Sequence, residues 1–180
     1  MSDSGRALPP APPGKETIFG LAFNALLFVL AYIASIFLAD SYRNFRVGAA
    51  CVAIRSDIQR WKFWKRYGIF FDGNTQIRPG WHPEKSCAEH KLTKAAESEG
   101  FDVIPVIAIV APGQPDDDSG VNWGATIPCG HCRRDFTAHM ENGGLIKSDT
   151  RIVAFNLRTL RCVRITVADL AGLRNNFRAD

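Results

Sequence analysis

Three cysteines and one glutamate are the residues of this chain best suited to chemistry. Glu89 follows two residues after Cys87, and Cys129 and Cys132 form a Cys-x-x-Cys pair that Pro128 precedes. Zinc binds thiolates readily, and three protein ligands leave its fourth tetrahedral position open to water. We therefore predict a catalytic Zn²⁺ site with the three cysteines as ligands. Glu89 is predicted to be the catalytic residue that moves protons to and from the water.

The elements around these residues favour such a site. Residues 87–99 and about 129–140 have helical character, so a cysteine stands at the start of each predicted helix. A helix N-terminus carries partial positive charge, which favours thiolate over thiol. The apolar run at 103–111 is typical of a strand buried on both faces and separates the two halves of the motif. A closed structural zinc site with a histidine as fourth ligand and a redox Cys-x-x-Cys are the alternatives.

The remaining pattern predicts an α/β protein. Further strands and a short last helix are predicted at 45–54, 67–71, 151–157, 162–167 and 167–173. The first two strands would pair as a hairpin across the basic, aromatic insert 55–66. We expect a three-layer sandwich, with a central mixed five-stranded sheet and helices on both faces. Cys51 and Cys162 fall in apolar strands and are predicted to lie in the core.

Composition and hydropathy divide the chain into three parts. A length of 180 residues with 46% hydrophobic residues suits one folded domain, predicted at 40–180. The net charge is only +4, and the chain lacks the long basic tracts of a dedicated nucleic-acid binder. The proline-rich residues 1–16 are predicted to be a disordered tail. Residues 17–39 form an apolar run with two interpretations: a membrane anchor, or the buried first helix of the domain.

The cysteine count and the flanking charges bear on location. Five cysteines, two of them in a Cys-x-x-Cys pair, argue against a disulfide framework and for a reducing compartment. Basic residues are richer on the C-terminal side of 17–39. We therefore expect a cytoplasmic protein, or a membrane-anchored one whose domain faces the cytosol.

With these residues in view, the chain resembles the small zinc-dependent cytidine deaminases of nucleoside metabolism and pyrimidine salvage, and their blasticidin-type relatives. The resemblance covers roughly Asp40 to Phe177. It is carried by four stretches: Tyr42–Ala50 (YRNFRVGAA), Gly73-Asn74, Cys87-Ala88-Glu89 and Pro128–Arg133 (PCGHCR). The second and third cysteine positions and the preceding Pro fit the known deaminase signature, in which the glutamate is the general acid and base. The resemblance thus implies hydrolysis of cytidine, deoxycytidine or a cytosine-containing analogue to the uracil form with release of ammonia.

The resemblance also implies roles for residues that bind the substrate. Phe45 would lie against the pyrimidine, and Asn74 would hydrogen-bond the ribose. Gln76 stands where nucleoside deaminases usually carry a glutamate that holds the sugar hydroxyl, so it would bind the substrate without the strength of a charge-assisted bond. Assembly as a homo-oligomer, a tetramer, is implied as well.

Two further residues are expected beside the zinc ligands. Many relatives carry an arginine directly after the glutamate, where it hydrogen-bonds the ligand sulfurs, and this chain has His90 there. Arg133, or the neighbouring Arg134, would then supply positive charge to the thiolates.

Two other functions remain open at this point. The insert 55–66 interleaves basic and aromatic residues, which fits single-stranded nucleic acid, a membrane surface or a solvated hairpin tip. A single-stranded nucleic-acid cytosine deaminase or binding module is therefore an alternative function, although the modest charge makes it less favoured. A catalytically silent zinc-binding scaffold is the other.

Overall fold

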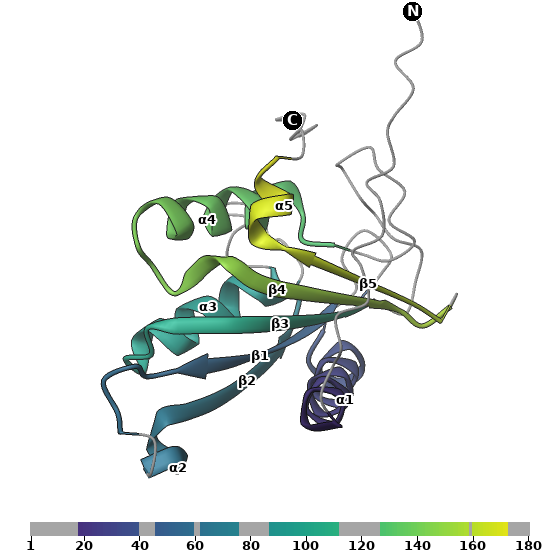
Figure 1. Cartoon of the computed structure of the whole chain (residues 1–180). Coiled ribbons are helices and arrows are strands. Elements are labelled where there is room, and N and C mark those ends of the chain that lie inside the picture. The colour runs from purple at the N-terminus through teal and green to yellow at the C-terminus, as the bar shows by residue number, and fades with distance from the viewer. Residues whose placement is uncertain are drawn as a thin grey trace, which may run out of the picture.

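The five strands of the sheet are hydrogen-bonded in the order β2-β1-β3-β4-β5 (Figure 1). A computed structural model of the chain describes residues 18–39, 46–59, 62–75, 87–111, 127–158 and 160–172. The strands are β1 (Gly48–Ile54), β2 (Tyr67–Gly73), β3 (Val103–Ala111), β4 (Ile146–Asn156) and β5 (Arg161–Thr166). β3 and β4 run parallel, and the other neighbouring pairs are antiparallel. The sheet is therefore mixed, as the sequence predicts.

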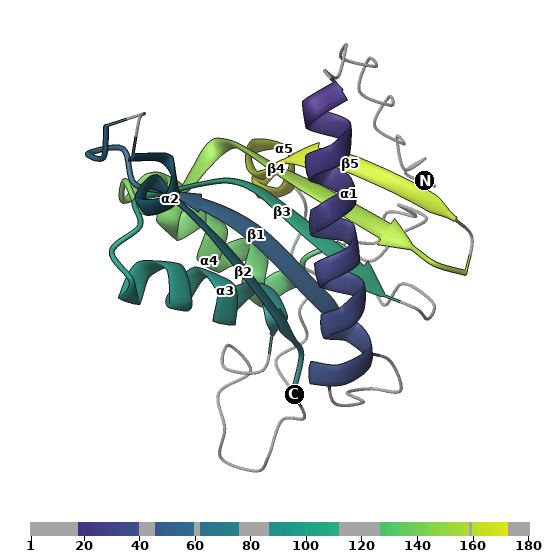
Figure 2. The same ribbon diagram turned by 90° about the horizontal axis from the view of Figure 1, so that it is seen from below.

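Helices cover both faces of this sheet, which confirms the three-layer architecture. One face carries α1 (Ile18–Ile33) and the π-helical turn η1 (Ala34–Leu38). The other carries α3 (Ala88–Ser98), α4 (Gly130–Glu141) and α5 (Val167–Ala171), as Figures 1 and 2 show. The four-residue helix α2 (Phe63–Arg66) lies in the connection between β1 and β2. The sheet thus separates α1 from the two helices that carry the cysteines.

α1 is the first helix in the part of the chain that the structure describes. It crosses the sheet in Figure 2 and packs on β1 and β3. Leu27 and Ala31 are buried in this contact. Residues 18–33 thus form a helix that packs on the sheet, as one of the two interpretations of 17–39 expects.

The residues that the structure describes include no helix both long enough and apolar enough to cross a membrane.

Small residues let α1 approach the sheet closely. A Cβ atom on Gly48 would overlap the carbonyl oxygen of Ala31 and the backbone nitrogen of Ser35. A Cβ on Gly73, which pairs with Gly48 across β1 and β2, would overlap the backbone of Ala39. Both glycines therefore serve the close contact between the end of the first helix and the sheet.

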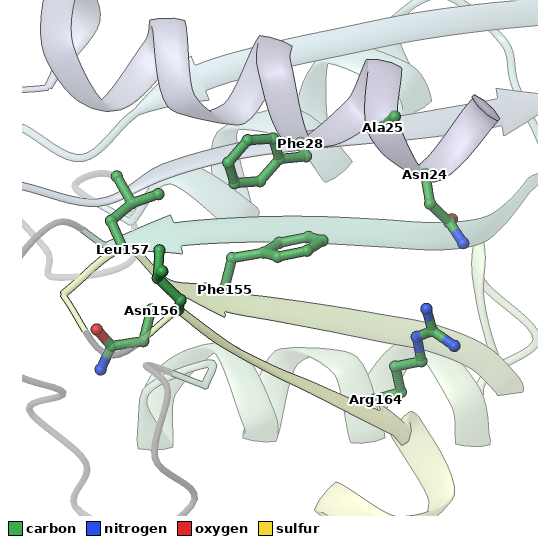
Figure 3. Close-up of a pocket in the computed structure, with 8 residues that line it drawn as sticks. Asn24, Ala25, Phe28, Phe155, Asn156, Leu157 and Arg164 are labelled. Carbon is green, nitrogen blue, oxygen red and sulfur yellow. The ribbon is translucent and has the colours of Figure 1, made fainter. Parts of the chain in front are cut away.

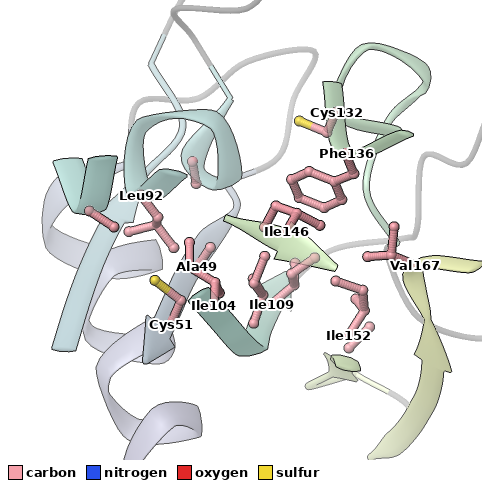
Figure 4. Packing of buried hydrophobic residues seen from close by; sticks show 14 of the residues in the cluster. Ala49, Cys51, Leu92, Ile104, Ile109, Cys132, Phe136, Ile146, Ile152 and Val167 are labelled. Atoms are coloured by element: carbon pink, nitrogen blue, oxygen red, sulfur yellow. The ribbon is translucent and has the colours of Figure 1, made fainter. Parts of the chain in front are cut away.

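The main core lies between the sheet and the helices α3, α4 and α5 (Figure 4). Leu92 of α3, Phe136 of α4 and Ile107 of β3 are fully buried there. Cys51 is also buried, as predicted, and burial raises the pKa of its thiol to about 12. Cys162 is exposed, so its prediction as a core residue was wrong. It lies on β5, an edge strand, and one side of an edge strand need not be covered.

Candidate metal centre and active site

The three predicted zinc ligands lie together at the starts of two helices. Cys87 is the N-cap residue of α3 and Cys129 is the N-cap residue of α4, while Cys132 lies in the first turn of α4. Their sulfur atoms all lie within 4.8 Å of one another, and Cys87 Sγ is 3.5 Å from Cys129 Sγ. Sulfurs bound to one tetrahedral zinc ion are about 3.8 Å apart, so the cluster fits this metal. None of the three cysteines forms a disulfide.

The cluster has one preferred site for negative charge. Hydrogen bonds from the thiols of Cys132 and Cys87 hold the pKa of Cys129 well below its usual value, and the backbone N–H groups of Cys132 and His131 add to this effect. The hydrogen bond to Cys129 raises the pKa of Cys87. Hydrogen bonds to Cys129 and Cys87, together with burial, raise the pKa of Cys132. The metal-free centre therefore holds one thiolate and two thiols.

Glu89 is buried beside the cluster, with 5% of its surface exposed. Burial, together with the charge of the Cys129 thiolate, raises the pKa of Glu89 to about 7. A carboxyl group with a pKa near 7 can both accept and donate a proton at neutral pH, as a general acid and base must. Glu89 therefore has an acidity suited to proton transfer, and its catalytic role stays a prediction.

Arg133 directly follows Cys132, the second cysteine of the Cys-x-x-Cys pair. Its side chain is buried, with 2% exposed, and Nη1 donates a hydrogen bond of 3.0 Å to the carbonyl oxygen of Pro128. Pro128 directly precedes Cys129, so this bond fixes the backbone that leads into the ligand pair. A buried cation in this position also favours thiolates nearby. Its direct contact with the sulfurs stays a prediction.

His90 faces α4. Its Nδ1 lies 3.1 Å from Asp135 Oδ2, with the imidazole N–H donating to the carboxylate. On the other side, His139 Nε2 lies 3.9 Å from the same oxygen. The sequence predicts His90 beside the zinc ligands, whereas Asp135 and His139 were not predicted to be parts of the site. A signal was available: His90 follows Cys87 by three residues, and Asp135 follows Cys132 by three.

Asn74 lies at the end of β2 and is buried. Its Oδ1 accepts a hydrogen bond of 2.7 Å from the backbone N–H of Val47, and its own N–H donates to the Val47 carbonyl oxygen at 2.8 Å. Lys91 of α3 donates from Nζ to the carbonyl oxygen of Gly73 at 2.6 Å. These bonds bring the end of β2 against the first turns of α3, which carries Cys87 and Glu89. Phe45 and Gln76, the other two predicted substrate contacts, lie outside the described residues, as does the predicted tail 1–16.

The β1–β2 connection is a hairpin, as predicted. Arg55 N donates to the Arg66 carbonyl oxygen at 2.9 Å, and Arg66 Nη1 donates to the Ile58 carbonyl oxygen at 3.0 Å. Trp64 is 62% exposed on α2. The roles in nucleic-acid or membrane-surface binding stay predictions.

A cavity of about 360 Å³ lies on the α1 side of the sheet, between α1 and the β4–β5 hairpin (Figure 3). Its walls include Phe28 and Phe155. Both pack against the smaller core cluster under α1, so the sheet separates this cavity from the cysteines. Among the residues that the structure describes, none of the predicted site residues lines it.

Solved structures of similar fold are cytidine deaminases. The structure of cytidine deaminase from Burkholderia pseudomallei aligns with a TM-score of 0.56 and 21% identity, over 81% of this chain and 94% of that one. The enzyme from Mycobacterium leprae gives 0.48 and 20%, over 82% and 96%. The enzyme from Mycobacterium tuberculosis gives 0.46 and 22%, over 81% and 91%. No protein-family model and no curated protein sequence matches the chain. On the first alignment, the chain has a cytidine-deaminase-like fold.

Proposed function

We propose that this chain is a zinc-dependent deaminase that hydrolyses the exocyclic amine of a cytosine nucleoside, such as cytidine or deoxycytidine, or of a related analogue. One observation supports this most strongly. The Cys87, Cys129 and Cys132 sulfurs lie within 4.8 Å of one another, and the buried Glu89 lies beside them with a pKa of about 7. Three protein ligands, which leave the fourth position of zinc open to water, and one nearby proton carrier suit a hydrolytic zinc centre.

The side chains divide the work of the reaction. Zinc held by the three cysteines would act as a Lewis acid that lowers the pKa of water toward neutrality. Glu89 accepts a proton from the water while the water oxygen adds to C4 of the ring. Glu89 then delivers that proton to N3 and carries the second one to the departing amine. The products are the uracil-type ring and ammonia, and together they contain the atoms of the substrate and one water molecule.

A structural role for the metal is less well supported. Burying Glu89 next to a thiolate opposes folding at neutral pH, because both effects disfavour the ionised carboxylate. A closed structural site has no use for such a group. A catalytically silent scaffold would likewise be destabilised by the buried Glu89 without using it as a proton carrier, so we favour the enzyme.

Recognition of a sugar would use Asn74. Its Oδ1 is bonded to the backbone of Val47, which fixes the orientation of the amide and leaves Nδ2 as the donor to a hydroxyl. Gln76 would add a neutral hydrogen bond, and Phe45 an apolar surface for the ring. We therefore propose that the site binds a ribose, but more weakly than it would with a glutamate in place of Gln76.

We also propose that the chain forms a homo-oligomer. The side of α1 and η1 that faces away from the sheet exposes large apolar residues, among them Val29, with 47% exposed, and Phe37, with 77%. The edge strand β2 contacts η1 and exposes Ile69 and Phe71. Exposed apolar side chains on neighbouring elements are typical of subunit contacts. Phe37→Asp should shift the mass measured by light scattering toward the monomer, whereas Leu160→Asp should not; a monomeric wild type would contradict the proposal.

A substrate panel tests the proposed activity. The zinc-loaded protein is incubated with cytidine, deoxycytidine and free cytosine, and the uracil-type product is measured for each. We expect product from the nucleosides, and a lower KM for cytidine in Gln76→Glu. Absence of product from all three substrates would contradict a nucleoside deaminase. Because cytoplasmic thiols stay reduced, we propose that the enzyme works there.

A further inference from the structure

A histidine and an aspartate link the two helices that carry the cysteines. α3 packs mainly on β1 and β2, whereas α4 packs on β4 and α5. The helices that bring Cys87 to Cys129 and Cys132 are thus held by different parts of the sheet. Their separation needs a restraint of its own, because a small shift of one helix changes the distances from Cys87 Sγ to the sulfurs of Cys129 and Cys132.

The bond between His90 and Asp135 lies where such a restraint would act. His90 comes three residues after Cys87 on α3, and Asp135 comes three residues after Cys132 on α4. Residues three apart share one face of a helix, so each partner lies one turn below a ligand. The 3.5 Å contact between the Cys87 and Cys129 sulfurs lies at the starts of the two helices. The 3.1 Å bond between His90 Nδ1 and Asp135 Oδ2 joins the same helices about one turn further along.

The surroundings of Asp135 keep it in the form that accepts this bond. Its side chain is 26% exposed, and that of His90 is 14% exposed. Burial acts to raise the pKa of Asp135, but the hydrogen bond and charge of His90 and the charges of His139 and Lys94 hold it below its usual value. The carboxylate is therefore ionised at neutral pH, and a charge-assisted bond in partial burial is stronger than a neutral one.

We propose that Asp135 is a positioning residue of the metal centre, which sets the separation of Cys87 from Cys129 and Cys132 by accepting the His90 N–H across α3 and α4. His139, 3.9 Å from the same oxygen, braces the carboxylate from its own helix. The inference rests on the proposed zinc centre. It deepens that proposal by adding residues outside the ligand set, since supporting hydrogen bonds of this kind commonly change metal affinity by about 10–100-fold.

The test compares two substitutions of one residue. Asparagine places an amide nitrogen close to the position of the histidine Nδ1, so His90→Asn keeps the bond to Asp135, whereas His90→Leu removes it. Zinc dissociation constants are measured on the full chain by competition with a chelating dye. We expect His90→Leu to bind zinc about 10–100-fold more weakly and His90→Asn to stay within a few-fold of wild type. Glu97→Gln is the matched control, because its ion pair with Lys94 lies within α3.

Two further readouts separate positioning from general stability. The visible absorption of the cobalt-loaded protein reports ligand geometry, and it should change in His90→Leu and stay unchanged in His90→Asn. The double variant His90→Leu with Asp135→Leu should bind zinc no more weakly than either single variant, because one bond is lost in each case. If His90→Leu does not fold, His90→Ala gives the same test, since alanine also lacks a donor to Asp135.

Two results would overturn the inference alone: equal zinc affinity in His90→Leu and wild type, or a loss in His90→Asn as large as in His90→Leu. A wild-type chain that binds no zinc would overturn the proposed function together with the positioning role.

Discussion

Cys87 Sγ lies 3.5 Å from Cys129 Sγ, although 42 residues separate them in the chain. The contact exists because α3 and α4 lie on the same face of the sheet and begin close together (Figure 1). The N-terminal ends of both helices thus meet at one point. Several properties of the metal-free protein follow from this arrangement.

Zinc binding should release about two protons near neutral pH. Before metal binds, Cys129 is the thiolate, while the pKa values of Cys87 and Cys132 are raised. Both thiols must deprotonate to become ligands. Calorimetry of zinc binding in two buffers with different ionisation enthalpies measures the number directly. Zinc affinity should also rise with pH, and an affinity independent of pH between 6 and about 8 would contradict the assigned charge states.

Glu89→Gln should stabilise the metal-free protein at alkaline pH. The folded-state pKa of about 7 is raised from 4.5, so the wild-type contribution to stability is complete below 4.5 and is lost as pH rises through about 7. Glutamine stays neutral throughout. Above pH 7, its free energy of unfolding should exceed that of wild type by up to about 3 kcal/mol. Urea unfolding with a chelator present measures this, and Glu141→Gln, exposed at the end of α4, is the control. A gap between the Glu89 variant and wild type that shrinks with rising pH would refute the assignment.

Arg133→Gln should weaken zinc binding by about 10–100-fold. The substitution removes a buried positive charge and the 3.0 Å hydrogen bond to Pro128 that fixes the approach to Cys129. Arg134→Gln, at an exposed position of the same helix, is the matched control and should bind zinc as wild type does. The dye-competition assay applies to both variants, and an unaffected Arg133→Gln would leave this arginine without a role in the metal centre.

Gly48→Ala should destabilise the fold by about 1–3 kcal/mol or more, because the added methyl group overlaps the backbone of Ala31 and Ser35. Gly172→Ala is the comparison, since its nearest new contact lies at 3.6 Å, an ordinary van der Waals distance. Chemical denaturation of both variants gives the two free energies. Equal stability would mean that α1 does not approach β1 as closely as the structure shows.

Sequence patterns predicted the parts of the fold that hydropathy controls. β3 spans the residues expected for it, Val103–Ala111, because a continuous apolar run has few alternatives inside a sheet. β4 begins earlier than expected, at Ile146, since Lys147, Ser148 and Asp149 hide the start of the strand behind polar side chains. The apolar run at 17–39 allowed two interpretations because hydropathy is high in both a buried helix and a membrane span.

The candidate site was predictable where chemistry limits the choice of residue. Few residue types bind zinc, so the cysteines stand out in the sequence, and Glu89 follows from its spacing to Cys87. Asp135 carries only a weak mark, its spacing of three residues from Cys132, because an aspartate on a helix is ordinarily a solvated charge. Its bond to His90 depends on how α3 and α4 pack, which a single sequence does not contain.

The central claim is that Glu89 and the three-cysteine centre together deaminate a cytosine nucleoside. Ammonia release from cytidine by the zinc-loaded protein tests it most directly, with Glu89→Gln loaded with the same amount of zinc beside it. We predict one ammonia per uridine formed by the wild type, and a rate at least about 100-fold lower in the variant. Wild-type protein that holds one zinc per chain and releases no ammonia, or a variant as active as wild type, would contradict the account.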